Sequence, residues 1–320
     1  MNTKYILIVL GEPYSTFSEI IGKYFVKTKN LKDKIILIGN KNLLLKQLKN
    51  LNYLFKLNEI KNFKEAKKNA INIIDIEFKH YKTYNSITDL SNTYIKECFD
   101  ESLKILKQNY KNSILINGPI SKRTFLKKKY LGITEYLAKK TKSKNETMLI
   151  YNDILSVSPI TTHIPVKYIA KKIKKKKIIN HAIKINNFYR KIFNKKIKIA
   201  ILGLNPHCET IDIYSEEEKV IIPSIKYLQN KGLNVEGPIS ADTFFLKKNI
   251  KKFDVVIGMY HDQVLTPIKT LFEFKAINLT IGLPFIRISP DHGPNTEMLG
   301  KNKSDPSSFF YAMDFIKKIK

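Results

Sequence analysis

The chain has 320 residues, 43% of them hydrophobic, which is ordinary for a globular protein. This length exceeds the roughly 250–300 residues at which a single hydrophobic core stops growing, so two domains are expected. Lysine and arginine outnumber aspartate and glutamate by 57 to 28, a formal net charge of +29, but the excess is mostly lysine scattered along the whole chain, which favours a lysine-biased composition over a nucleic-acid groove.

The cysteine content and the hydropathy of the chain indicate the cellular compartment in which it is expected. Cys98 and Cys208 are too few and too far apart for a disulfide framework or a cysteine zinc site, so a reducing compartment is expected. The apolar run at 6–10 is too short for a signal-peptide core, and no later run reaches the roughly 18 apolar residues that a membrane span requires. We therefore expect a cytoplasmic protein with no membrane partner.

The first part of the chain alternates strand-like and helix-like segments. Continuous apolar runs at 5–10 and 34–39 are typical of buried parallel strands, and another strand is predicted over 69–78. Apolar residues at helical spacing predict helices over 18–25, 43–48 and 92–108. This alternation indicates βα units and hence an α/β sheet with mostly parallel strands.

The same pattern continues in the remainder of the chain. Further strands are predicted at 113–116, 148–151, 155–157, 197–202, 255–259 and 276–281. A helix with acids in its first turn opens at Ser215, a loop is predicted at Gly237-Pro238, and a closing helix is predicted over 307–318. The lysine run at 171–177 favours one solvated face of a helix over a basic patch.

Three of the six histidines occupy equivalent positions. His163, His207 and His261 each follow an apolar strand-like run, and strand ends at one edge of a sheet converge in space. Three neutral imidazoles with an open coordination position suit a divalent metal that acts as a Lewis acid. Because the spacing matches no short metal motif, ordinary hydrogen-bonded loop histidines stay an alternative. His80 and His181 lie in polar contexts and are expected at the surface.

Cations and hydrogen-bond donors stand near other strand ends. Lys269, Asn278, Arg287 and the pair Ser121-Lys122 would suit a ligand with a phosphate and a carboxylate, although each could equally be a surface residue. Arg287 lies among apolar residues at 285–288, surroundings in which a charged group requires a partner. These residues therefore predict an anion-binding site.

Seven motifs follow one another in order along nearly the whole chain. They lie at 118–122, 132–137, 161–165, 203–207, 237–243, 260–263 and 278–293. The most distinctive are Tyr-His-Asp-Gln at 260–263 and Gly-Leu-Pro-Phe-Ile-Arg at 282–287. Together they closely resemble the 4-hydroxythreonine-4-phosphate dehydrogenase family of vitamin B6 biosynthesis.

This resemblance implies a fold and an assembly. The expected fold is α/β and isocitrate/isopropylmalate dehydrogenase-like, with two α/β/α domains and a cleft between them. The first domain would comprise 1–120 plus 285–320, and the second 121–284 with the metal and substrate residues. A homodimer is implied in which the partner subunit completes each site.

The resemblance also implies a reaction and its residues. The reaction is NAD-dependent oxidation of 4-phosphooxy-L-threonine, followed by decarboxylation to 3-amino-2-oxopropyl phosphate. The implied metal, which could be zinc, magnesium, cobalt or manganese, would be bound by His163, His207 and His261. The substrate contacts carry over to Thr134, Lys269, Asn278 and Arg287, and the catalytic candidates are Lys269, Asp262 and Asp242. NAD, with NADP as the alternative, would contact Asp291, His292 and Gly293.

The chain departs from the family pattern at several positions. Ile133 stands where the family usually has a histidine, Pro294-Asn295 replaces the usual Thr-Ala, and the N-terminal loop at 11–19 carries bulkier side chains than the usual glycine-rich loop. Two alternatives therefore stay open. One is a paralogous dehydrogenase of another phosphorylated hydroxy acid, favoured by Ile133. The other is a basic nucleic-acid-binding protein on a degenerate dehydrogenase scaffold, favoured by the charge and the altered loops.

Overall fold

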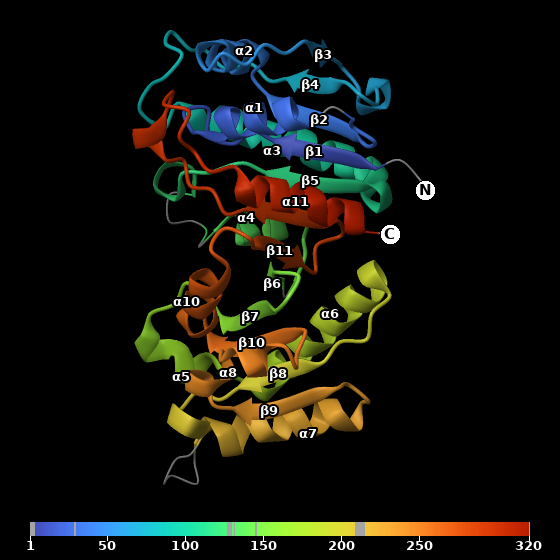
Figure 1. Cartoon of the computed structure of the whole chain (residues 1–320), viewed down its shortest axis with the longest axis vertical. Helices are drawn as coiled ribbons and strands as arrows, with labels where there is room; N and C mark the ends of the chain where they lie inside the picture. Colours follow the sequence, from blue (N-terminus) through green and yellow to red (C-terminus); the bar gives the residue numbers. More distant parts are fainter. Residues whose placement is uncertain are drawn as a thin grey trace. The chain divides into compact units, whose positions relative to one another are not determined.

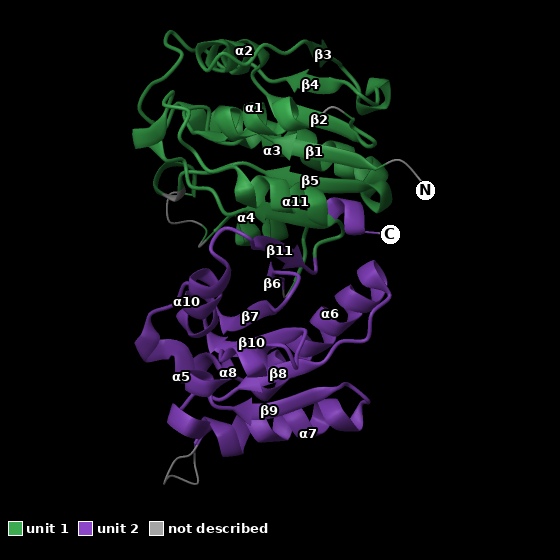
Figure 2. Ribbon diagram, in the orientation of Figure 1, with its two compact units in different colours: residues 1–144, 283–315 green, residues 145–282, 316–320 purple. Residues whose placement is uncertain are grey.

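The structure is a computed structural model that describes residues 4–28, 30–126, 130, 132–144, 146–208 and 215–319. It divides into two compact units, the first formed by 1–144 with 283–315 and the second by 145–282 with 316–320 (Figure 2). Each unit therefore combines segments that are distant in the sequence. The domain boundaries expected from the sequence stay a prediction, because compact units defined by contacts need not coincide with domains.

In the described part of the first unit, the strands lie in the order β3-β4-β2-β1-β5-β12 (Figure 1). Their bounds are Tyr5–Val9 (β1), Lys34–Gly39 (β2), Leu57–Glu59 (β3), Ile71–Asp75 (β4), Ser113–Asn117 (β5) and Ile286–Pro290 (β12). The five pairings that join them are parallel. Parallel neighbours require crossover connections, which here contain the helices that the sequence predicted.

Helices of the first unit pack on this sheet and on one another. They are α1 (Phe17–Lys27), α2 (Lys41–Asn50), α3 (Ser91–Asn109), α4 (Ile133–Lys140) and most of α11 (Ser307–Lys318), with short turns η1 (Phe63–Glu65), η2 (Tyr110–Asn112), η3 (Lys122–Leu126) and η7 (Thr296–Met298). Leu7, Ile36 and Leu115 from the strands and Ile95 and Phe99 from α3 are fully buried in one cluster. Apolar faces at helical spacing therefore form the core of this unit.

Among the described residues of the second unit, the strands lie in the order β11-β6-β7-β10-β8-β9. Their bounds are Thr147–Tyr151 (β6), Ser156–Thr161 (β7), Ile199–Leu202 (β8), Val235–Ile239 (β9), Val255–Tyr260 (β10) and Ile277–Ile281 (β11). The β11–β6 and β6–β7 pairings are antiparallel, whereas β7–β10, β10–β8 and β8–β9 are parallel. The carboxyl ends of β7, β10 and β8 consequently lie at the same edge of this sheet.

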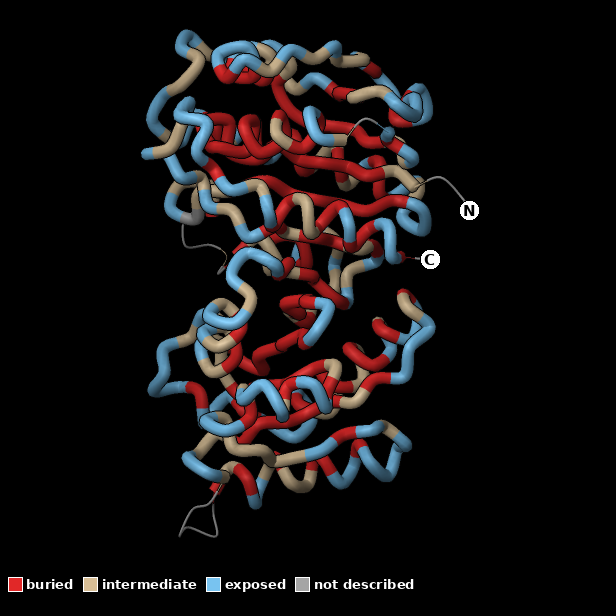
Figure 3. The backbone as a smooth tube through the Cα atoms, in the orientation of Figure 1, coloured by how far each residue is buried: buried red, intermediate tan, exposed pale blue. Residues whose placement is uncertain are grey.

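The helices of the second unit enclose its core. They are α5 (Ile169–Lys172), α6 (Lys175–Phe193), α7 (Ile222–Asn230), α8 (Ala241–Phe244), α9 (Lys247–Ile250) and α10 (His261–Phe272), with turns η4 (Val166–Tyr168), η5 (Pro206–Cys208) and η6 (Glu217–Ile221). Val157, Ala200 and Val256 from the strands pack with Val264 and Ile268 of α10. Figure 3 shows most of the strands as buried segments, whereas the edge strands β3 and β9 are mostly half-buried or exposed. Core packing thereby fixes α10, the helix that begins at His261.

Three strands were not predicted from the sequence: β3, β9 and β12. β3 has only three residues, Leu-Asn-Glu, which is too short to give a pattern. β9 runs through Gly237-Pro238, where a loop was predicted; it is the edge strand beside β8, and an edge position tolerates a proline that cannot donate to a ladder. β12 was not predicted because Arg287 and Ser289 interrupt its apolar pattern. The lysine run at 171–177 is divided between α5 and α6 around the buried Ile173, and its lysines are exposed, as expected for solvated helix faces.

The prediction that His181 lies at the surface was wrong. His181 is 7% exposed, on the inner face of α6 with Ile178, Ala182 and Ile185. Its Nε2 lies 2.6 Å from the Oγ of Ser158, and burial lowers its pKa to about 3. The helical spacing of these residues was the signal for burial. His80 is half-buried, with Nδ1 3.1 Å from the carbonyl oxygen of Phe78.

The helices and the two cysteines can also be described with respect to membranes and disulfides. Over the described part of the chain, no helix is both long enough and apolar enough to cross a membrane. Cys98 is buried and Cys208 is half-buried, and neither forms a disulfide there.

Candidate functional site

The three candidate metal ligands follow adjacent parallel strands of the second unit. Thr161, the last residue of β7, pairs with Tyr260, the last residue of β10. His163 comes two residues after β7, His261 directly after β10, and His207 lies in η5 after β8. The sheet therefore delivers all three histidines to one edge, where ligands of open α/β sheets bind.

The histidines are not all in contact. The rings of His163 and His261 have centroids 5.7 Å apart and an interplanar angle of 38°. Two imidazoles on one tetrahedral ion have centroids on the order of 5 Å apart, so this pair fits a shared ion. The Nδ1 of His207 instead lies 3.5 Å from the Oδ2 of Asp242. Within the described residues, no group of three or more His, Cys, Asp or Glu side chains is arranged to hold a metal.

The backbone of two of these loops is strained. The φ angle is 42° at His163, 57° at His207 and 60° at Cys208, in the left-handed region that non-glycine residues rarely adopt. Such a conformation costs on the order of 1–3 kcal/mol per residue and persists only where surrounding contacts hold it. Residues of this kind cluster in binding and catalytic sites, which supports a functional role for these loops.

Hydrogen bonds tie the three strand ends together. The Oγ1 of Thr161 donates to the carbonyl of Met259 at 2.7 Å. The Nε2 of Gln263 donates to the carbonyl of Gly203 at 2.8 Å, and its Oε1 accepts the N–H of Met259 at 2.7 Å. The loops after β7, β8 and β10 are therefore linked near the histidines. The sequence placed Gln263 in a motif but indicated no role for it.

A buried carboxylate holds the loop that carries His207. Glu217 is 1% exposed. Its Oε1 accepts the N–H groups of Leu204 at 2.7 Å and Asn205 at 2.9 Å, and its Oε2 accepts the Nδ2 of Asn205 at 2.6 Å. Burial favours a higher pKa for Glu217, but the hydrogen bonds from Asn205 and Leu204 outweigh it and lower the pKa. The sequence indicated only that Glu217 is a first-turn acid of a helix.

Both candidate catalytic aspartates contact a histidine. The Nδ1 of His261 lies 2.6 Å from the Oδ1 of Asp262, an arrangement that orients the ring and leaves Nε2 as the nitrogen for a ligand. Asp242 accepts a hydrogen bond from Ser240, and this bond, followed by the charge of His207, lowers its pKa. Both carboxylates are largely exposed, which suits residues that border an open site.

Lys269 lies on the same helix as His261. Leu265 and Lys269 follow His261 at positions i+4 and i+8 of α10, so the three half-buried side chains share one side of the helix. Burial lowers the pKa of the Lys269 ammonium. A lysine whose pKa is lowered is better suited to accept a proton near neutral pH.

Asn278 presents a buried acceptor without a hydrogen-bond partner. Its Oδ1 is inaccessible to solvent and bonds to no group among the described residues. A buried acceptor left unsatisfied costs about 1–3 kcal/mol. A bound ligand that donates a hydrogen bond to this atom would remove the cost. This property is compatible with the predicted contact to a substrate.

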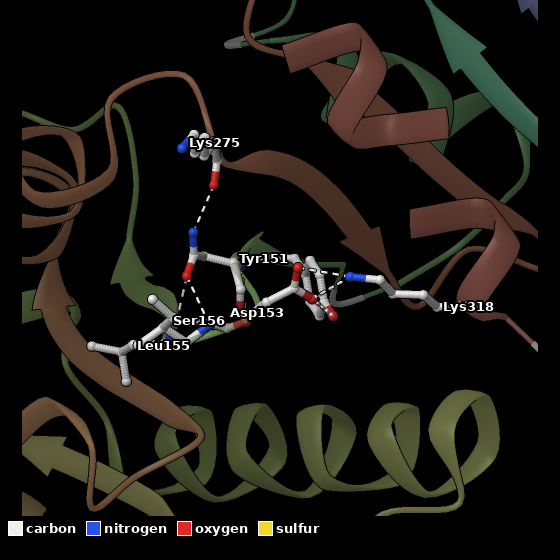
Figure 4. A network of polar contacts seen from close by, with 8 residues as sticks. Tyr151, Asp153, Leu155, Ser156, Lys275 and Lys318 are labelled. Carbon is white, nitrogen blue, oxygen red and sulfur yellow. Dashed lines mark hydrogen bonds and ion pairs between the residues drawn. The ribbon is translucent and has the colours of Figure 1, made fainter. Parts of the chain in front are cut away.

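The strand that carries Asn278 is fixed by the network in Figure 4. The Nδ2 of Asn152, in the loop after β6, donates to the carbonyl of Lys275 at 2.6 Å. Asp153 beside it accepts the hydroxyl of Tyr151 and the ammonium of Lys318, each at 2.7 Å. The bond from Asn152 anchors the segment that leads into β11, and the bonds of Asp153 hold the loop after β6.

Arg287 and Thr134, both in the first unit, are joined directly. The guanidinium of Arg287 is 1% exposed. Its Nε donates to the Oδ1 of Asn117 at 2.8 Å and its Nη1 donates to the Oγ1 of Thr134 at 3.3 Å. Burial lowers the pKa of Arg287 to about 9, against the opposing charge of Glu135. The prediction that Arg287 needs a buried partner is confirmed.

The predicted cofactor residues follow β12 in the first unit. The N–H of Asp291 donates to the Oγ of Ser308 at 2.8 Å, and the N–H of His292 donates to the carbonyl of Pro290 at 2.9 Å, which shapes the turn before Gly293. An open cavity of about 1040 Å³ lies in the same unit, and its lining includes Lys82, Tyr84, Ser121, Arg123, Thr296 and Leu299. No local pattern in the sequence marked Lys82, Tyr84 or Arg123. The side chain of Lys122 lies outside the described residues.

The sequence matches a known family over most of its length. A family model described as pyridoxal phosphate biosynthetic protein PdxA matches residues 31–316. The 4-hydroxythreonine-4-phosphate dehydrogenase of Sulfurihydrogenibium sp. (strain YO3AOP1) is 37% identical over 314 residues, which cover 96% of this chain and 95% of that protein. All the predicted site residues lie within the family match.

Solved structures of dehydrogenases resemble the fold of this chain. A 4-hydroxythreonine-4-phosphate dehydrogenase from Klebsiella pneumoniae superposes with a TM-score of 0.85 at 25% identity, covering 99% of this chain and 97% of that one. A β-decarboxylating dehydrogenase from Thermococcus kodakarensis, 11% identical, reaches a TM-score of 0.54 over 98% of this chain and 84% of that one, and shows the fold alone. The predicted isocitrate/isopropylmalate dehydrogenase-like fold is confirmed.

The family match and the structural likeness point to one conclusion. The motifs on which the resemblance was based carry the histidines, Arg287 and Thr134, which the structure places at strand ends or in direct contact. The relative and the solved structure that match nearly the whole chain have the same name. The chain therefore belongs to the PdxA family of pyridoxal phosphate biosynthetic proteins, whose members are dehydrogenases.

Proposed function

We propose that this chain oxidises 4-phosphooxy-L-threonine with NAD and a divalent metal, and that the product loses carbon dioxide to give 3-amino-2-oxopropyl phosphate for pyridoxal phosphate biosynthesis. The observation that carries the proposal is the buried Arg287–Thr134 pair, because a buried guanidinium held in place by hydrogen bonds suits an anionic ligand. Relatives named for this activity match nearly the whole chain, which supports the same assignment.

Four residues would bind the substrate. Arg287 and Lys269 would neutralise its phosphate and carboxylate, while Thr134 and Asn278 would supply hydrogen bonds. The bonds from Arg287 to Asn117 and Thr134 fix the plane of its guanidinium. A fixed guanidinium loses little entropy on binding and orients the substrate for reaction.

His163, His207 and His261 would hold the divalent ion, which could be zinc, magnesium, cobalt or manganese. The imidazole donors and the adjacent rings of His163 and His261 support this assignment. When bound, the ion would supply Lewis acidity toward the substrate hydroxyl and, later, the ketone. Asp262 would orient His261 through its contact with Nδ1.

NAD, or alternatively NADP, would bind in the first unit. Asp291, His292 and Gly293 would contact the cofactor, and the cavity of about 1040 Å³ that includes Thr296 offers room for part of it. Lys82 and Arg123 in the cavity lining are cations suited to phosphates. The cofactor would accept the hydride, and the chain would supply binding and orientation.

Lys269, Asp262 and Asp242 are the candidates for moving the proton of the substrate hydroxyl. Lys269 is favoured, because burial lowers its pKa toward the range in which it can accept a proton. Asp242 has a lowered pKa and is therefore a weaker base. We further propose a cytoplasmic homodimer with a site shared between subunits, and domains at 1–120 plus 285–320 and at 121–284.

The direct test follows NADH absorbance with 4-phosphooxy-L-threonine and with other phosphorylated hydroxy acids, in the presence and absence of a chelator. We expect turnover of 4-phosphooxy-L-threonine that chelator abolishes and added metal restores. Preference for another phosphorylated hydroxy acid would establish the paralogous activity that Ile133 favours. Turnover of no compound in the panel would overturn the proposed dehydrogenase activity.

A further inference from the structure

We propose that Glu217 is a positioning residue: its carboxylate holds residues 203–208 in the conformation that presents His207 to the metal, without itself touching metal, substrate or cofactor. This inference rests on the proposed function, since it assumes that His207 is a ligand. It concerns a residue that neither the histidine pattern nor the family motifs singled out.

The contacts of Glu217 are directed at the backbone just before His207. Two consecutive N–H groups, those of Leu204 and Asn205, converge on Oε1, while the Nδ2 of Asn205 reaches Oε2. The same Nδ2 also donates to the Oε2 of Glu216 at 3.1 Å. A single buried side chain thus fixes the path of the chain two and three residues before His207.

Gly203, the first residue of the loop, is also held by hydrogen bonds. The N–H of Gly203 donates to the carbonyl of Ile239 at 3.0 Å, and the carbonyl of Gly203 accepts from Gln263 on the helix of His261. A side chain at Gly203 would have its Cβ 2.5 Å from the Sγ of Cys208 and 3.0 Å from the Oε1 of Glu217. The loop is therefore packed directly against the carboxylate.

This anchoring accounts for the strained backbone that follows. His207 and Cys208 have φ angles of 57° and 60°. Without contacts that hold it, the loop would relax to a conformation with less backbone strain. Charge-assisted hydrogen bonds to a buried carboxylate are about twice as strong as neutral ones, so they can offset strain of this size. Loss of the Glu217 carboxylate should let residues 204–208 relax and move the His207 imidazole.

The choice of acid at this position has a chemical reason. The hydrogen bonds that Glu217 accepts from Leu204 and Asn205 all come from N–H donors, so both of its oxygens must accept. Glutamine has nearly the same shape, but its NH₂ group would face either the backbone donors or the Nδ2 of Asn205. Glu217→Gln therefore removes the negative charge and the acceptor on one side of the carboxylate, with little change in packing.

Glu218 provides the matched control. It lies next to Glu217 in η6, its side chain is exposed, and Glu218→Gln makes the same change in charge. Asn205→Ala is a second test variant, because it removes two of the hydrogen bonds of the loop from a half-buried position that should not endanger folding.

The experiment titrates the full-length, metal-stripped chain with Co²⁺ by calorimetry, and also measures amide hydrogen exchange in residues 203–208. Glu217→Gln should weaken Co²⁺ binding by about 10–100-fold, the usual effect of losing a group that orients a metal ligand. It should also speed exchange at Leu204 and Asn205, and excess Co²⁺ should restore kcat for 4-phosphooxy-L-threonine. Asn205→Ala should act in the same direction with a smaller effect, and Glu218→Gln should match the wild type.

The outcomes separate this inference from the proposed function. If the wild type binds Co²⁺, His207→Ala loses it, and both Glu217→Gln and Asn205→Ala bind as the wild type does, the positioning role is wrong and the proposed function stands. If the wild type binds no Co²⁺, the metal-dependent function fails and the inference fails with it. If Glu217→Gln does not fold, Glu217→Asp decides, because it keeps the charge but is one methylene too short to reach the loop: wild-type Co²⁺ affinity and wild-type exchange at Leu204 and Asn205 overturn the role.

Discussion

The Nη1 of Arg287 donates a hydrogen bond to the Oγ1 of Thr134 at 3.3 Å and thereby joins β12 to the first turn of α4. The same guanidinium bonds to Asn117 at the end of β5, the strand beside β12. Three strand and helix ends of the first unit are thus connected through one buried cation. Because burying a guanidinium is unfavourable, a buried arginine at this place fits a binding role better than a stabilising one.

Arg287→Lys should weaken substrate binding much more than it destabilises the fold. Lysine cannot reproduce the planar fork that reaches Asn117 and Thr134 together, and hydrogen bonds to charged groups contribute about 1.5–3 kcal/mol. We expect kcat/KM for 4-phosphooxy-L-threonine to fall by about 10–100-fold, measured by steady-state NADH formation. Thr134→Val is the milder companion, because it removes only one of these bonds. Wild-type kinetics in Arg287→Lys would show that the guanidinium does not bind the substrate.

The sequence predicted the parts of the site that depend on strand ends. Apolar runs located β7, β8 and β10, and the topology of parallel strands then required His163, His207 and His261 to share an edge. Family motifs supplied Thr134 and Arg287, whose contact the structure shows. These features are predictable because they depend on periodicity and topology.

Other parts of the site could not be predicted because they depend on tertiary contacts. Glu217 lies 12 residues after Asn205, and no local pattern links the two. Only the folded structure brings the Glu217 carboxylate to the backbone N–H of Asn205. The lining of the cavity of about 1040 Å³ comes from three separate segments of the chain, and no local pattern connects Lys82 with Arg123. His181 was misjudged because its polar neighbours in sequence face solvent while its own position on α6 faces the core.

His181 should make stability depend on pH. Burial lowers its pKa from the ordinary 6.5 to about 3 in the folded state, so at intermediate pH the unfolded chain binds a proton that the folded chain does not. This contribution is fully present above pH 6.5 and is lost as pH falls, by about 1.4 kcal/mol for each pH unit until about pH 3. Urea unfolding of the wild type and His181→Gln between pH 7 and pH 4.5 would measure it. Equal slopes for the two proteins would refute the assignment.

Glu12 should have the opposite effect at higher pH. Burial, opposed by a hydrogen bond from Ser91, raises its pKa from 4.5 to about 7, so the folded state holds the proton more tightly than the unfolded state does. The stability that Glu12 contributes is therefore fully present below pH 4.5 and is lost as pH rises to about 7. Glu12→Gln should be more stable than the wild type by on the order of 1–3 kcal/mol at pH 8 and nearly equal at pH 4. Denaturant unfolding at the two pH values measures the difference, and a loss of stability at both would contradict it.

The His163–His261 pair should make thermal stability depend on metal. A ligand that binds only the folded state stabilises it by an amount that grows with ligand concentration, about 2.7 kcal/mol at one hundred times Kd. We expect Tm to rise with added Co²⁺ or Zn²⁺ and to return to its starting value with chelator. His163→Ala and His261→Ala should both abolish the rise, because each removes one of two adjacent rings. His80→Ala, remote in sequence and bonded to Phe78, is the control for adventitious binding to imidazole. A rise in Tm that persists in both site variants but is lost in His80→Ala would place the metal elsewhere.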